Sequence, residues 1–299
     1  MSSSPRAAER TLARFAPSAA RRRRDLLARR IVLVGTILAL IPLVLILYYL
    51  LSKGLGAWSP SFFTSDPTGN TFFGAAKIGG IKSAILGTIE MVALAGAIAI
   101  PIGVGVAVWL VEYGRDGWFA QTVRFFTDVM TGVPSIVFGL FVYIALIVGT
   151  GSSYAAYKGS IALALLMLPI VIRAGEVVLL LVPDSLRESG LALGAPRWRV
   201  IGSVVLPTAV PGMLTGMLLA IARAAGETAP LLFTAAATHE TSFNLGGFMN
   251  SLPVQIYSDV TSPTAAVVER AWGAALTLVL MILILNMVAR LIARRSRLA

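Results

Sequence analysis

Two pairs of opposite charges lie inside long apolar stretches of the sequence. Arg173 and Glu176 are three residues apart, and Arg223 and Glu227 are four residues apart. On an α-helix, both spacings bring the two side chains onto one face. A guanidinium group is a planar fork that donates two hydrogen bonds at once to an oxyanion such as phosphate. We therefore expect Arg173 and Arg223 to line an anion pathway, with Glu176 and Glu227 holding them and keeping the anion from binding too tightly.

A purely structural role for the same pairs is the alternative interpretation. A charged side chain near the centre of a membrane costs at least about 2.5–3.5 kcal/mol, so it persists only when it is paired or lines a polar path. Two ion pairs that simply hold helices together satisfy that rule too. Pro169 and Pro230, one near each arginine, favour the pathway. Each removes a backbone hydrogen bond, and broken helices at membrane depth must face protein or water.

The elements that carry these pairs are predicted membrane spans. Of the 299 residues, 57% are hydrophobic and only 13% are charged, which excludes a soluble enzyme, a secreted disulfide scaffold and a disordered chain. The absence of cysteine and the single histidine also exclude thiolate and multi-histidine metal sites. We predict an all-α membrane protein with six transmembrane helices, at residues 31–51, 84–111, 123–148, 160–182, 208–236 and 271–293.

The basic residues predict the orientation of these spans. With both termini in the cytoplasm, 18 Lys and Arg residues lie on the cytoplasmic side, including Arg115 and Arg124, and 5 lie outside. The net charge of +11 therefore reports on topology, and no nucleic-acid partner is expected. Residues 1–30 form a basic tail, expected to be disordered or to lie on anionic membrane lipid. Residues 31–299 form the transmembrane domain. Asp128 is expected near the inner end of the third span, within reach of lipid headgroups.

A cytoplasmic helix–turn–helix is predicted at residues 183–207. Ser185 and Glu188 have capping-box spacing, Gly194 suits a left-handed helix end, and Gly190 leaves a bare patch for another surface. The segment is either an interfacial amphipathic helix or a lever that docks into a soluble partner. The residues that we assign to the docking function are Asp184, Glu188, Gly190 and Gly194.

This loop resembles a known motif. Glu188, Gly194 and Pro207 have the spacing of the "EAA" loop in membrane subunits of ABC importers, which inserts into a cleft on the ATPase, although Ser189 and Gly190 replace its two alanines. Within that family, four further segments are similar to the PstA family of phosphate permease subunits. These segments are residues 132–140, 193–198, 221–233 and 252–257, and the resemblance covers about residues 80–293.

The resemblance implies a type I ABC importer permease fold in the bacterial plasma (inner) membrane. It implies a multi-pass, non-catalytic subunit that forms half of the pathway of an inorganic phosphate importer. The implied partners are a second, PstC-like permease, a PstB-like ATPase dimer and a PstS-like phosphate-binding protein outside the cell. ATP and Mg²⁺ would bind the ATPase, since this chain has no Walker A motif and no cofactor of its own is expected. In the family, arginines at the positions of Arg173 and Arg223 are implicated in transport.

Other functions remain open at this stage. Two arginines cannot distinguish phosphate from sulfate, molybdate or another oxyanion. A self-contained, ion-coupled anion carrier could use Glu176 and Glu227 as proton sites, but it would need no docking loop. An intramembrane enzyme is disfavoured, because the sequence has no zinc-protease motif and no pair of catalytic aspartates at membrane depth.

Overall fold

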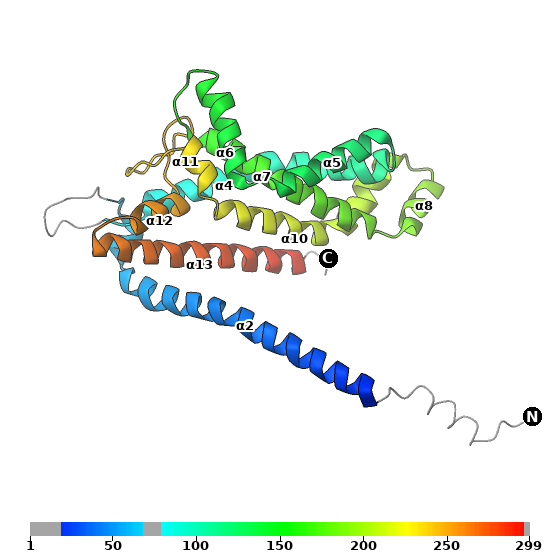
Figure 1. Cartoon of the computed structure of the whole chain (residues 1–299). Coiled ribbons are helices and arrows are strands. Elements are labelled where there is room, and N and C mark those ends of the chain that lie inside the picture. The colour runs from blue at the N-terminus through cyan, green and yellow to red at the C-terminus, as the bar shows by residue number, and fades with distance from the viewer. Residues whose placement is uncertain (1–18, 68–78, 296–299) are drawn as a thin grey trace, which may run out of the picture. The chain divides into compact units, whose positions relative to one another are not determined.

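The structure is a computed structural model, and its described residues are 19–67 and 79–295 (Figure 1). It divides into two units, residues 1–52 and 53–299. Most of the first unit belongs to α2 (Ala19–Ala57), whose apolar side chains are largely exposed, as expected for a helix that faces lipid. The predicted disordered tail, residues 1–30, overlaps α2 from Ala19 onward, and residues 1–18 lie outside the described residues.

In the part of the second unit that the structure describes, helices joined by loops are the only regular secondary structure apart from a single β-bridge between Pro67 and Gly79. In chain order, and after the C-terminal end of α2, its elements are α3 (Pro60–Thr64), α4 (Lys82–Val108), η1 (Trp109–Gly114), α5 (Trp118–Gly132), α6 (Ser135–Tyr143), η2 (Ile144–Val148), α7 (Ala156–Leu180), α8 (Asp184–Ala192), α9 (Arg197–Val200), η3 (Ile201–Val205), α10 (Leu206–Ala225), α11 (Ala229–Thr234), α12 (Leu252–Val260) and α13 (Ala265–Arg295). The three η elements are π-helical turns.

Among the residues that the structure describes, five helical stretches are long and apolar enough to cross a membrane, and there are six crossings if one bent pair counts as a span. The prediction of an all-α protein with six spans is confirmed in that sense. The predicted third span, residues 123–148, is not a single straight helix. It breaks at Val133 and Pro134 into α5 and α6, with a bend of 102°. Pro134 cannot donate a backbone hydrogen bond, and it disfavours helical geometry at Val133.

The predicted fifth span, residues 208–236, is wrong at both ends. Its helix starts at α9 and continues through η3 into α10, so residues 197–225 form one candidate span. It ends at Gly226, and α11 starts separately after Thr228, with Pro230 in its first turn. Pro230 is therefore a helix-starting residue here, because its missing N–H is not needed at that position. Pro169, in contrast, remains inside α7.

α7 is the central helix of the unit. It packs against α4 on one side and α10 on another, and the core between them contains Met91, Ala95, Leu163, Met167 and Ala220. The α7–α10 contact is close: a Cβ atom on Gly216 would lie 2.1 Å from the Cβ of Ala174. Small residues at such positions let two membrane helices approach backbone to backbone. α10 and α13 also lie side by side (Figure 1).

α6 and α11, which each begin after an interruption of a membrane-spanning helix, pack on each other. α6 contacts α11, and a Cβ atom on Gly139 would lie 2.5 Å from the Cα of Pro230. Only glycine allows so close an approach of two backbones.

Candidate functional site

The first predicted charge pair lies on α7. Arg173 donates from Nη1 to Oε2 of Glu176 at 2.7 Å, one helical turn away. The Glu176 side chain is only 6% exposed, because α7 is covered by its neighbours. The predicted pairing on one helix face is therefore confirmed, while the transport role of the two residues stays a prediction.

α5 supplies two more members of this cluster, which the sequence analysis did not assign to the pathway. Arg124 donates from Nε to Oε1 of Glu176 at 2.5 Å, and Asp128 accepts from Nε of Arg173 at 2.8 Å. Arg124 was expected in a cytoplasmic loop and Asp128 near the lipid headgroups; the structure places both on α5 and pairs them with side chains of α7, which was not predicted. The available signal was their spacing of four residues, which places both on the face of α5 that meets α7.

The second pair, Arg223 and Glu227, is arranged differently. Arg223 lies in the last turn of α10, and Glu227 follows the helix end at Gly226. Their Nε and Oε1 atoms are 3.9 Å apart, so the pair is a long ion pair across a helix end. The predicted continuous helix face is wrong here, because the helix stops before Glu227. Arg223 leaves 52% of its side chain exposed, compared with 32% for Arg173.

Both arginines lie along the same seam between α5 and α7. Arg173 contacts Asp128 and the Arg124 carbonyl, whereas Arg223 lines a small hollow one turn further along α5. The other residues around this hollow are Met130, Thr131, Val133, Phe138, Leu166, Pro169 and Ile170. The structure thus brings the two arginines to neighbouring points of one seam, but it gives each its own carboxylate partners.

The helix–turn–helix predicted at residues 183–207, called the coupling loop from here on, is ordered. α8 spans Asp184–Ala192, and Gly194 has a φ of +79°, so the predicted left-handed helix end is confirmed. The capping box is wrong, because Pro183 precedes the first turn and Ser185 lies inside the helix. The bare patch at Gly190 is filled from within the loop, since a Cβ there would lie 2.9 Å from a methyl group of Val200. Asp184 and Glu188 are exposed.

The tip of this loop exposes large apolar side chains. Leu193 is 88% exposed, and Leu191 and Trp198 are also exposed. Exposed apolar residues that gather on a short polar segment are typical of a contact surface.

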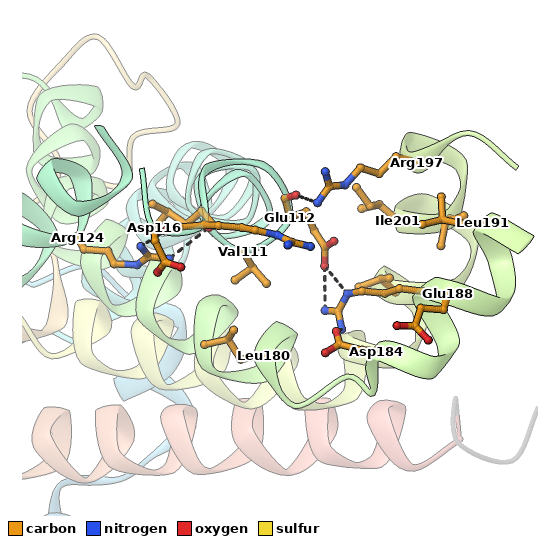
Figure 2. A pocket seen from close by; sticks show the side chains of 15 residues that line it. Val111, Glu112, Asp116, Arg124, Leu180, Asp184, Glu188, Leu191, Arg197 and Ile201 are labelled. Carbon is orange, nitrogen blue, oxygen red and sulfur yellow. Dashed lines mark hydrogen bonds and ion pairs between the residues drawn. The ribbon is translucent and has the colours of Figure 1, made fainter. Parts of the chain in front are cut away.

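A cavity of about 620 Å³ separates this loop from the end of α4 (Figure 2). Glu112, on η1, lies in the middle, with Arg124 at one end and Glu188 at the other (Figure 2). Its carboxylate is buried and accepts from Nε and Nη2 of Arg187 on α8, at 3.0 and 2.9 Å. No local pattern in the sequence predicts this pair, because 75 residues separate its members. Within the described ranges 19–67 and 79–295, no group of acidic, His or Cys side chains could hold a metal ion.

Comparison with known proteins places the chain in a family. A family model described as "Binding-protein-dependent transport system inner membrane component" matches residues 99–298. The chain belongs to this family. The matched range includes the Arg173 and Arg223 clusters and the whole coupling loop, and the permease is a multi-pass protein of the bacterial plasma membrane.

Several curated relatives of this permease are 41% identical to it over the aligned residues. One is the "Phosphate transport system permease protein PstA" of Yersinia pestis, aligned over 93% of this chain and 92% of the relative. Another is "Phosphate transport system permease protein PstA 1" of Mycobacterium tuberculosis, aligned over 95% and 94%.

Solved structures support the fold. The MetNI methionine ABC transporter, in an inward-facing conformation, matches with a TM-score of 0.59 and 21% identity, over 71% of this chain and 94% of that chain. A bacterial ABC transporter involved in import of the acidic polysaccharide alginate matches with a TM-score of 0.63 and 18% identity, over 91% and 96%. The permease therefore has the type I ABC importer permease fold.

Proposed function

We propose that this permease is the PstA-type subunit of an ATP-driven inorganic phosphate importer and forms half of its translocation pathway. The proposed partners are a PstC-like permease, a PstB-like ATPase dimer that binds ATP and Mg²⁺, and a PstS-like phosphate-binding protein. Relatives that bear the name of a phosphate permease and align over nine-tenths of both chains support this assignment.

The observation that carries the proposal is the exposure of two arginines on membrane-spanning helices. Arg173 leaves 32% and Arg223 leaves 52% of the side chain uncovered in the single chain. Hydrocarbon is a costly environment for a guanidinium group, so these faces must meet water or another protein surface. A second permease that covers the α5–α7 seam would enclose a wet pathway lined with guanidinium groups, whose geometry suits the oxygens of phosphate.

The carboxylates suit a conducting site. Glu176 and Asp128 compete with an anion for Arg173, and Glu227 does so for Arg223 at longer range. A transported ion must bind well enough to enter and weakly enough to leave. A guanidinium group with carboxylates beside it satisfies both requirements.

The coupling loop supplies the proposed link to ATP. Its exposed Leu193 and Trp198 would seat in the ATPase, while Asp184 and Glu188 lie on the exposed surface of α8. Closure of the ATPase dimer on ATP would then move the loop as a rigid lever, because Val200 of α9 packs directly against Gly190 of α8.

The assignment of Arg223 to the anion pathway is tested by measuring phosphate uptake by a complex that contains the Arg223→Gln variant. We expect a loss of at least about tenfold in initial rate, since a charge-assisted contact is worth about 1.5–3 kcal/mol. Arg29→Gln, in the exposed part of α2, is the matched control and should transport normally. The complex should still co-purify with its ATPase. Unchanged uptake by Arg223→Gln would remove the anion-pathway assignment.

Competition decides the substrate. Excess sulfate or molybdate should leave phosphate uptake unchanged, and strong inhibition by either would favour the wider oxyanion permease. Uptake that continues without the ATPase would instead indicate an ion-coupled carrier.

A further inference from the structure

A series of hydrogen bonds and ion pairs, called the line below, starts at α8, which is the coupling helix of the loop. Arg187 of α8 donates to the Glu112 carboxylate and also to the carbonyl oxygens of Leu179 and Val182, at 2.9 and 2.6 Å. Its guanidinium group therefore has acceptors on three sides and only 15% of the side chain is exposed. A planar fork with several fixed acceptors holds its geometry better than a single ion pair does.

Both helices of the coupling loop hold the same residue of η1. Glu112 receives Arg187 of α8 on its carboxylate, and its carbonyl oxygen accepts from Nη2 of Arg197 on α9. η1 is a π-helical turn at the end of α4, and the residue after it, Arg115, has a positive φ of 39°. Irregular turns of this kind often mark functional positions in helices.

Arg124 holds the other side of this turn. From α5 it donates to the carbonyl oxygen of Arg115 at 2.6 Å and to that of Leu110 at 3.2 Å. Its Nε donates to Glu176, which also accepts from Arg173. One guanidinium group thus connects the turn between α4 and α5 to the carboxylate that holds the pathway arginine.

We propose that Glu112 and Arg124 are positioning residues that connect the coupling helix α8 to Arg173. Movement of α8 displaces Glu112 through Arg187, the η1 turn moves with it, and Arg124 then shifts Glu176 and so re-aims Arg173. This inference rests on the proposed function, because it assumes that an ATPase drives α8 and that Arg173 meets the anion. It adds that the pathway arginine is set by a specific hydrogen-bonded line and not only by rocking of whole helices.

The test measures phosphate transported per ATP hydrolysed by the whole complex in proteoliposomes, with phosphate-loaded binding protein. Arg124→Lys keeps a positive charge beside Glu176, but one ammonium group cannot span the carboxylate and both carbonyl oxygens. We expect the ratio to fall about fivefold or more, the range of ordinary coupling between sites. If charge compensation of Glu176 were the only role of Arg124, lysine would preserve the ratio.

Glu112→Gln is the second variant, with nearly the same shape and no charge for Arg187. We expect a similar fall, and the double variant should be no worse than the more affected single variant, since both changes interrupt one line. Asp116→Asn is the matched control: its exposed side chain lines the same cavity and makes none of the contacts of the line. Its ratio should stay within about twofold of that of the unmodified complex.

An unchanged ratio in Arg124→Lys, or additive losses in the double variant, would overturn the connection. So would failure of both single variants to assemble with the ATPase, since the contacts would then serve assembly. If the unmodified complex moves no phosphate, the proposed function fails instead. The connection is then tested by the rate of ATP hydrolysis that a loaded binding protein stimulates in the complex. The same variants are compared, and the same pattern of losses is expected.

Discussion

Arg173 and Arg223 are the same residue type on two helices that pack together, yet their surroundings differ. Arg173 is held by two carboxylates, Glu176 and Asp128, at 2.7 and 2.8 Å. Arg223 has one carboxylate, Glu227, at 3.9 Å, and more of its side chain is exposed. Under the proposed function, the two arginines divide the labour: Arg173 meets the anion in a geometry that the α7 cluster fixes, and Arg223 meets it with a more exposed guanidinium group at the end of α10.

Among the substitutions that test this comparison, Glu176→Gln is expected to have the largest effect. Glu176 is nearly buried and accepts from two arginines, so its loss leaves two guanidinium groups short of a counter-charge. We expect a loss of about 3–5 kcal/mol, typical of removing one partner from a buried ion pair. Thermal unfolding of the purified complex measures it. A change below about 1 kcal/mol would mean that water or a partner chain already compensates these arginines.

Gly216→Ala tests the contact that places the two clusters side by side. The added methyl group would lie 2.1 Å from Ala174, so α10 must move away from α7. Overpacking of this kind costs about 1–3 kcal/mol and shifts Arg223 away from the seam. Gly202→Ala is the control, because nothing lies within 4 Å of a Cβ at that position. Equal unfolding temperatures for the two variants would show that α10 can move away from α7 without a loss of stability.

Gly194→Ala extends the comparison to the coupling loop, where a backbone angle rather than a charge is decisive. The positive φ costs an alanine about 1–2 kcal/mol, with no steric contact to add to it. We expect weaker co-purification of the ATPase, with spans that unfold at the usual temperature. Gly194→Asn should retain more of the partner, because asparagine tolerates this conformation better. Identical yields for the two variants would contradict a backbone origin.

The smallest effect is expected from Glu227→Gln, the counterpart of Glu176→Gln. Its ion pair is long and half of its partner is exposed, so we expect less than about 1 kcal/mol in the same unfolding assay. A loss as large as that of Glu176→Gln would show that Glu227 holds Arg223 as firmly as the α7 cluster holds Arg173, and would remove the division of labour.

Local patterns in the sequence predicted some local features correctly, although the capping box at Ser185 and the continuous helix face of Arg223 and Glu227 were wrong. The spacing of Arg173 and Glu176 gave their contact, and Gly194 gave the left-handed helix end, because both depend on residues within one or two turns. Glu112 and Arg187 could not be paired from sequence, since 75 residues separate them and only the tertiary fold brings η1 and α8 together at one cavity. Hydropathy found the third span but not its 102° bend, because an apolar window carries no information on direction.

The close approach of Gly139 to Pro230 limits how the subunit can deform. α6 and α11 each follow an interruption of the helical chain, so each could swing as a separate flap. With so little space between their backbones, neither flap can slide past the other. Any movement must therefore carry α6 and α11 together as one rigid body, and a bulkier residue at position 139 would separate the two helices.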